Sequence, residues 1–264
     1  MFMSTTTRSL VEDTLSKVPA VTFGFWIIKV ACTTLGETGG DWVTMSLNLG
    51  YLVGSLIFLA CFVVLVAAQI RARRFYPWLY WATIVATTTL GTTLADFFDR
   101  SLGVGYPGGV SIILLLLVAS LAIWYRVEGT VSIESVATPR VEWFYWITIL
   151  FSQTLGTALG DWVAGEDRGG LGVGYEYGAA IFGAGLVVVA LLWLWPRVSR
   201  TALFWFAFVL TRPLGATLGD LLDKPVADGG LHFSRFYASA LLVIFIVGCI
   251  VLLPQRAARR ARNA

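Results

Sequence analysis

The sequence is short of charge and of the side chains that build common soluble active sites. Asp, Glu, Lys and Arg make up 13% of its 264 residues, against 57% hydrophobic residues, and His232 is the single histidine. Phosphate-binding loops, dinucleotide-binding glycine patterns and His-Glu-x-x-His motifs are absent. His232 falls between apolar stretches, where we expect it to be solvated.

Cysteine is also scarce. Cys32, Cys61 and Cys249 all fall inside apolar stretches, which argues against a disulfide framework or a regularly spaced zinc site. We interpret them as small buried apolar residues. The first 17 residues are polar and carry no apolar core of a signal peptide. We expect no removable signal, so that the first membrane span acts as the insertion signal.

Long apolar runs dominate the remainder. A helix needs about 20 apolar residues to cross a bilayer, and the chain has eight such stretches. They predict an all-α integral membrane protein with eight transmembrane helices, of which the less polar even-numbered ones form the outer wall. The stretches are residues 21–43, 47–70, 76–98, 108–125, 142–164, 175–195, 201–222 and 234–253.

The distribution of charge predicts the orientation. Apart from Lys29 and Arg212, thirteen Lys and Arg residues lie at the termini and even-to-odd connections, and four lie at the opposite connections or directly beside them. The positive-inside rule then places both termini in the cytoplasm and the protein in the bacterial inner (plasma) membrane. Eleven acidic residues gather at the outer ends, and the resulting negative field attracts cations.

A short phrase occurs four times, each time ending in aspartate: residues 34–41, 89–96, 154–161 and 213–220. Its glycines are 55, 65 and 59 residues apart, the length of a two-helix hairpin. We therefore predict four tandem parallel hairpin repeats in two pseudo-equivalent halves. They form one membrane domain, 18–253, between a cytoplasmic segment, 1–17, and a basic tail, 254–264. The repeat bounds are approximately 18–72, 73–127, 140–197 and 198–253.

The phrase places polar residues on one helix face, because positions i, i+4 and i+7 share a side. We expect these stripes to form a polar axis through the membrane. Its acidic members are Glu37, Asp41, Asp96, Asp99, Asp161, Asp220 and Asp223. Its hydroxyl members are Thr34, Thr38, Thr89, Thr93, Thr154 and Thr217.

Small residues in the phrase favour close helix packing, which would bring the stripes together. The glycines with this expected role are Gly36, Gly40, Gly91, Gly156, Gly160, Gly215 and Gly219.

Carboxylates that converge at helix C-termini repel one another and oppose the helix dipole. A hard cation would relieve both penalties, and oxygen ligands favour Mg²⁺, Ca²⁺ or Mn²⁺. Asp41, Asp96, Asp161 and Asp220 are thus candidate ligands for a divalent cation. The alternative is that these aspartates are simply hydrated at the outer interface and that Thr and Gly serve packing alone.

Two basic residues fall within apolar stretches. Lys29 lies near the middle of the first and Arg212 at the middle of the seventh, where an unpaired charge is costly. We expect Lys29 to pair with Glu37 or with an aspartate of another repeat. A structural ion pair and a proton-exchanging site are both open for it.

Lys17-Val18-Pro19, Phe25-Trp26, Lys29 and the phrase from Thr33 to Asp41 resemble the opening of an uncharacterised bacterial "membrane-anchored protein" family built from tandem copies of a repeat of unknown function. The resemblance covers residues 17–253. It implies fold and location rather than a mechanism. Only the first repeat carries the Lys and Glu, which makes any site asymmetric.

These patterns favour a transporter or exporter of a small cation, in which Lys29 competes with the cation or exchanges protons. An intramembrane enzyme with an aspartate pair is the alternative, although the Gly-x-Gly-Asp phrase of membrane aspartyl proteases is not met. A non-catalytic membrane scaffold or sensor is the third reading. The expected partners are the lipid bilayer and a cation, since the arginines of the tail suit lipid headgroups and not nucleic acid.

Overall fold

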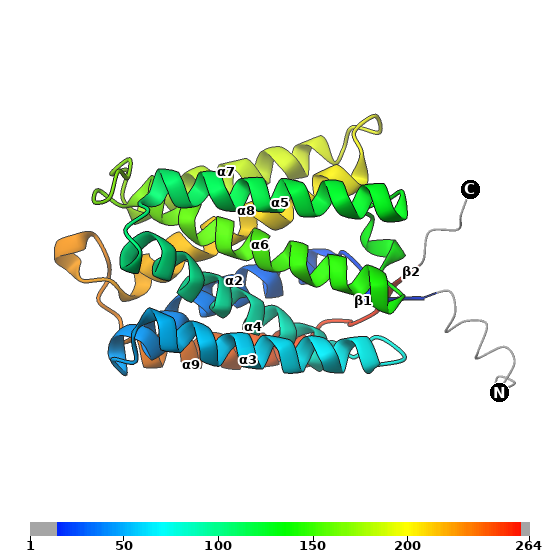
Figure 1. Cartoon of the computed structure of the whole chain (residues 1–264), viewed down its shortest axis with the longest axis horizontal. Coiled ribbons are helices and arrows are strands. Elements are labelled where there is room, and N and C mark those ends of the chain that lie inside the picture. Colours follow the sequence, from blue (N-terminus) through cyan, green and yellow to red (C-terminus); the bar gives the residue numbers. More distant parts are fainter. Residues whose placement is uncertain (1–14, 260–264) are drawn as a thin grey trace, which may run out of the picture.

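The computed structural model describes residues 15–259. Most of the predicted cytoplasmic segment 1–17 and the end of the basic tail lie outside the described residues. Within them the regular elements are helices apart from two short strands, β1 (Leu15–Pro19) and β2 (Ala257–Arg259). These strands pair antiparallel, so the two ends of the described chain meet at one end of the helical bundle (Figure 1).

Eight long helices make up the described bundle, and their ends lie within three residues of the stretches expected from the sequence. They are α2 (Phe23–Asp41), α3 (Gly50–Arg71), α4 (Pro77–Asp96), α5 (Tyr106–Glu128), α6 (Pro139–Ala164), α7 (Tyr175–Leu192), α8 (Arg200–Asp223) and α9 (Arg235–Leu252). Five of them, α3, α5, α7, α8 and α9, are long and apolar enough to cross a membrane. The motif helices α2, α4 and α6 carry more polar residues.

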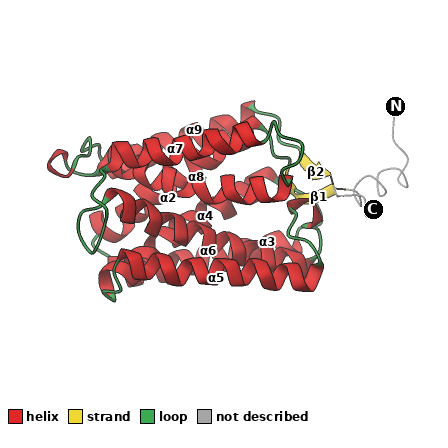
Figure 2. Cartoon of the chain, turned by 90° about the horizontal axis from the view of Figure 1, so that it is seen from above, coloured by secondary structure: helices red, strands yellow, loops and turns green. Residues whose placement is uncertain are grey.

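The four motif helices form an inner ring. Helix α2 packs on α4, α4 on α6, α6 on α8, and α8 returns to α2. The inner helices lie side by side within the bundle (Figure 2). Because the ring closes between the first and the last repeat, all four aspartate-bearing helices share one axis.

The outer helices pack mainly on the next repeat, with fewer contacts to their own inner helix. Helix α3 packs on α4, α5 on α6, α7 on α8, and α9 closes the circle on α2. Their outward faces are apolar and exposed, with Val64, Leu115 and Ile244 about two-thirds uncovered. This confirms that the second helix of each repeat belongs to the outer wall.

The first motif glycine of each repeat lies where the next inner helix crosses. A Cβ at Gly36 would collide with Thr88, and one at Gly91 would collide with Gln153. In the same way Gly156 faces Arg212, and Gly215 faces Thr33 of the first repeat. Each contacted residue stands three positions before the next motif glycine, so the packing repeats around the ring. Small residues permit this close approach.

An aromatic layer fills the ring toward the chain termini. Every repeat has Phe or Tyr followed by Trp, and the first aromatic of each repeat contacts the Trp of the next. Ring centroids are 5.4 to 6.5 Å apart in Phe25–Trp81, Tyr80–Trp146, Tyr145–Trp205 and Phe204–Trp26. Such pairs add about 0.5–1.5 kcal/mol each beyond burial. This end of the ring is therefore densely packed.

Candidate functional site

The four motif aspartates lie in the last turns of the inner helices. This end of the bundle is opposite the paired strands β1 and β2. Asp41, Asp96, Asp161 and Asp220 are each at most 4% exposed. In repeats one and two the helix passes directly after the aspartate into π-helical turns, Trp42–Ser46 and Phe97–Ser101. Turns of this kind are rare in proteins, and those that occur are often found at functional sites. The aspartates are thus buried in the bundle rather than simply hydrated at its surface.

Two basic side chains bridge the aspartates in pairs. Arg100 Nε lies 2.6 Å from Asp96 Oδ1, and Arg100 Nη2 lies 3.5 Å from Asp161 Oδ2. Lys224 Nζ lies 3.1 Å from Asp220 Oδ1 and 2.5 Å from Asp41 Oδ2. Each base thus pairs with the aspartate four residues before it and with one on a neighbouring inner helix. The two halves of the protein repeat this arrangement.

One helical turn deeper, a buried ion pair joins the last repeat to the first. Arg212 Nη2 donates to Glu37 Oε2 at 2.9 Å and lies 2.5 Å from the hydroxyl oxygens of Thr92 and Thr157. These four side chains come from α8, α2, α4 and α6, one from each inner helix. Arg212 therefore links all four inner helices at the centre of the ring.

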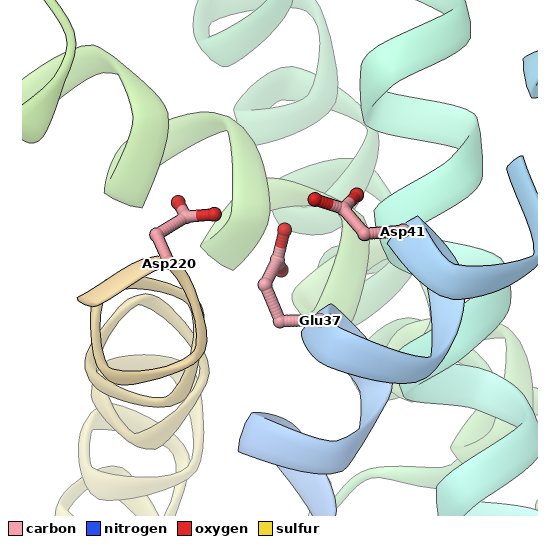
Figure 3. A group of neighbouring side chains, drawn as sticks. All are labelled: Glu37, Asp41 and Asp220. Atoms are coloured by element: carbon pink, nitrogen blue, oxygen red, sulfur yellow. The ribbon is translucent and has the colours of Figure 1, made fainter. Parts of the chain in front are cut away.

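Glu37, Asp41 and Asp220 form one compact group (Figure 3). Each offers a carboxylate oxygen, and these three atoms lie within 4.8 Å of one another. Their carboxylates point toward a common space between α2 and α8 (Figure 3). Oxygen ligands of this kind suit Mg²⁺, Ca²⁺ or Mn²⁺.

The additional acids of repeats two and four have different surroundings. Arg235 Nε lies 2.8 Å from Asp223 Oδ2, and Arg235 Nη2 lies 3.9 Å from Asp41 Oδ2. Asp99 packs against Gly109 at the start of α5. Neither of its oxygens accepts a hydrogen bond from a described residue, although the side chain is buried. Asp223 therefore belongs to the ion-pair network, and Asp99 lies beside it.

Burial and neighbouring charges shift the pKa values of Asp99 and Lys224, which lie just beyond the ends of α4 and α8. Burial raises the pKa of Asp99 to about 7, although Arg100 and Arg168 act in the opposite direction. For Lys224, burial alone lowers the pKa, but attraction by Asp220, Asp41 and Asp223 outweighs it. The pKa of Lys224 therefore lies well above its usual range, and the side chain stays an ammonium ion.

The six motif threonines expected on the axis direct their hydroxyls elsewhere. Most donate to carbonyls of their own helix, and Thr38 bonds Ser239 of α9. The own-helix donors are Thr34, Thr89, Thr93, Thr154 and Thr217. Each residue rotates a helix by about 100°, so Thr38, Thr93 and Thr217, three positions before their aspartates, are turned about 60° from the aspartate face. The axis hydroxyls are Thr92 and Thr157, which directly follow a motif glycine.

Lys29 corrects a second expectation, because it does not pair with Glu37. Its side chain is fully buried, and Nζ has no hydrogen-bond partner among residues 15–259. It stands 4.3 Å above the ring of Phe208, a cation–π contact. Arg212 holds Glu37 instead. Because the repeats are offset around a ring, sequence spacing alone does not reveal which basic residue reaches Glu37.

A cavity of about 830 Å³ opens beside the bridged aspartates. Arg100, Asp161, Lys224 and Arg235 line it, together with acidic residues of the connecting loops such as Glu176 and Asp228. The site therefore has access from the face opposite the chain termini. His232, in the loop that follows Lys224, is exposed as expected.

These features define a class of protein: all-helical, built from four repeats, with outer helices apolar enough for a membrane and buried carboxylates in the inner ring. The chain belongs to the family described as Repeat of Unknown Function (DUF347), whose model matches residues 24–75, 79–130, 144–199 and 203–256. Each match holds one inner and one outer helix. The comparisons with curated proteins and with solved structures find no match.

Proposed function

We propose that the protein transports a small hard cation, such as Mn²⁺, Ca²⁺ or Mg²⁺, along the axis of its inner ring. The excess of carboxylates around the closed ring carries this proposal. Among the described residues, seven buried acids meet four basic side chains there. The acids are Glu37, Asp41, Asp96, Asp99, Asp161, Asp220 and Asp223. Such an excess of negative charge inside apolar walls attracts a cation.

The chain would cross the bacterial inner membrane eight times, as four hairpin repeats with both termini in the cytoplasm. The exposed apolar faces of α3, α5, α7 and α9 support lipid contact on all outer helices. The polar inner helices can cross because their charged groups face one another inside the bundle. The asymmetry of Lys and Arg supports the orientation.

The two ends of the axis differ in a way that suits a carrier. The acidic end is open to the 830 Å³ cavity. Toward the termini, the axis is filled by the aromatic layer, where Tyr80 and Tyr145 are hydrogen-bonded at 2.7 Å and buried. A cation would thus enter from the outer face and would need a rearrangement of the inner ring to leave on the other side.

Cation binding to the purified protein tests this proposal. We expect at least one of Mn²⁺, Ca²⁺ and Mg²⁺ to bind in calorimetry and to raise the melting temperature, because a ligand of the folded state stabilises it. The Asp41→Asn/Asp161→Asn double variant should lose both effects. Asp228→Asn, a change at an exposed loop acid, should retain them. A folded wild-type protein that binds none of the three ions would overturn the proposal.

A further inference from the structure

The two halves of the ion-pair network differ in the base that bridges them. Arg100 joins Asp96 to Asp161, whereas Lys224 joins Asp220 to Asp41. A guanidinium holds carboxylates through a rigid planar fork. An ammonium is a compact charge on a flexible stem. The Arg100 bridge is therefore suited to hold two helices together, and the Lys224 bridge is the easier one to displace.

The halves also differ in their number of carboxylates. The residue after the first motif glycine is Glu37 in repeat one, whereas repeats two and three have Thr92 and Thr157 there. Glu37 completes a group whose three oxygens lie within 4.8 Å. One Ca²⁺ ion can be shared at this separation, because its oxygen ligands lie at about 2.3–2.6 Å from the ion and therefore at most about 5.2 Å apart. Within residues 15–259 this is the one group of three acidic side chains whose ligand atoms lie within 4.8 Å of one another.

One carboxylate oxygen of this group is buried without a partner among residues 15–259. Asp41 is 1% exposed, and its Oδ1 has no hydrogen-bond partner in the described part of the chain. Figure 3 shows its carboxylate directed toward Glu37 and Asp220. A buried acceptor without a donor is costly, and a bound cation would satisfy it.

Charge balance around the group fits a divalent ion. When ionised, Glu37, Asp41, Asp220 and Asp223 contribute four negative charges, and Arg212 and Arg235 pair with two of these acids. The remaining charge of −2 is half balanced by Lys224 and would be fully balanced by a divalent cation. Arg212 would keep Glu37 in place during the exchange, because an arginine does not lose its proton in proteins.

We infer that Glu37, Asp41 and Asp220 form the binding site for a hard divalent cation, and that the Lys224 ammonium is a tethered competitor which the cation displaces. The inference rests on the proposed function and deepens it, since it assigns the site to the interface of repeats one and four. The Arg100 ion pairs stay in place and hold α4 and α6 together. Displaced Lys224 moves into the cavity, where Glu176 offers a new carboxylate partner.

Chemical labelling of the wild-type protein tests the displacement without any substitution. The purified protein is treated with an amine acylating reagent with and without saturating MnCl₂, and the modification of Lys224 is quantified by mass spectrometry. We expect Mn²⁺ to increase labelling of Lys224 several-fold, because the amine leaves a buried ion pair. Lys17, which pairs with Glu142 at the other end of the bundle, is the internal control. Labelling of Lys224 that stays constant or falls at saturation would overturn the inference.

Mn²⁺ affinity in matched variants tests the asymmetry of the two halves. Lys224→Met should bind Mn²⁺ at least about tenfold more tightly, since it removes a competing unit charge, whereas Arg100→Met should not. Glu37→Gln and Asp220→Asn should abolish binding, and Asp96→Asn should keep it. Equal changes in the two methionine variants would overturn the inference while leaving cation transport in place. If the wild type binds no cation, the proposed function fails with it.

Discussion

Arg212 and Glu37 form an ion pair in the centre of the inner ring, 2.9 Å between Nη2 and Oε2, and their side chains are 0% and 3% exposed. The pair connects the last repeat to the first. Thr92 and Thr157 complete its surroundings from the other two inner helices. The only glutamate of the four motifs and the only basic residue three positions before a motif glycine thus meet at the point where the ring closes.

Breaking this pair should strongly destabilise the protein. Glu37→Gln or Arg212→Met should each cost about 3–5 kcal/mol, because either change leaves a buried charge without its partner. The double variant should cost clearly less than the sum of the two. Unfolding titrations of the four proteins in mixed micelles measure the coupling. Additive losses would show that the two side chains do not depend on each other.

Gly156→Ala should destabilise the inner ring, because the new Cβ collides with Arg212 Cβ and Cγ. Overpacking of this kind costs about 1–3 kcal/mol. Gly248→Ala is the matched control, since no atom lies within 4 Å of its added Cβ. It should be neutral or slightly stabilising, because alanine favours a helix over glycine. Melting temperatures of the two variants compare them, and equal melting would contradict the close packing of α6 on α8.

The Tyr80–Tyr145 hydrogen bond in the aromatic layer predicts a non-additive pair of substitutions. Tyr145→Phe should cost about 1–3 kcal/mol, since the buried hydroxyl of Tyr80 loses its 2.7 Å partner. The Tyr80→Phe/Tyr145→Phe double variant should recover most of this loss, because no hydroxyl is then left unpaired. Thermal unfolding of the single and double variants measures it. A double variant less stable than either single one would contradict the assignment.

Asp99 should make stability fall as the pH rises from about 4 to about 7. Its pKa is raised from 3.8 to about 7 in the folded protein, so the folded state holds a proton that the unfolded state has lost in this window. Above pH 7 Asp99 is ionised in both states, and the stability that its proton contributed has been lost. Asp99→Asn should remove this part of the pH dependence, and Asp228→Asn should not. Melting temperatures at pH 5 and pH 8 test it, and parallel profiles for wild type and Asp99→Asn would contradict it.

Much of the architecture follows from sequence pattern alone. The apolar runs predicted all eight helices because length and hydropathy are local properties. The repeated Gly and Asp predicted equivalent packing positions. The ring itself did not follow, because α3 packs on α4 and α9 on α2, and those partners depend on the closure of the whole chain.

The site was predicted in part. The acids were identified from their recurrence, and the structure buries them together. Their basic partners were not predicted, because Arg100 and Lys224 fall in connections between apolar stretches. Each nevertheless stands four residues after a motif aspartate, a spacing that favours an ion pair. The aromatic-Trp pair recurs in all four repeats of the sequence, but local spacing does not reveal that these pairs meet in one layer. The expected pairing of Lys29 with Glu37 is wrong because helix spacing predicts the face of a residue but not the neighbour that contacts it.

Cation flux through proteoliposomes tests the central claim most directly. Vesicles that contain the wild-type protein should take up Mn²⁺, Ca²⁺ or Mg²⁺ faster than protein-free vesicles. Flux should fall at least about tenfold in Asp41→Asn and Asp220→Asn and stay unchanged in Asp228→Asn. The account would be contradicted if the wild-type protein gave no more flux than protein-free vesicles for all three ions. It would also be contradicted if Asp41→Asn and Asp220→Asn both kept the flux of the wild type.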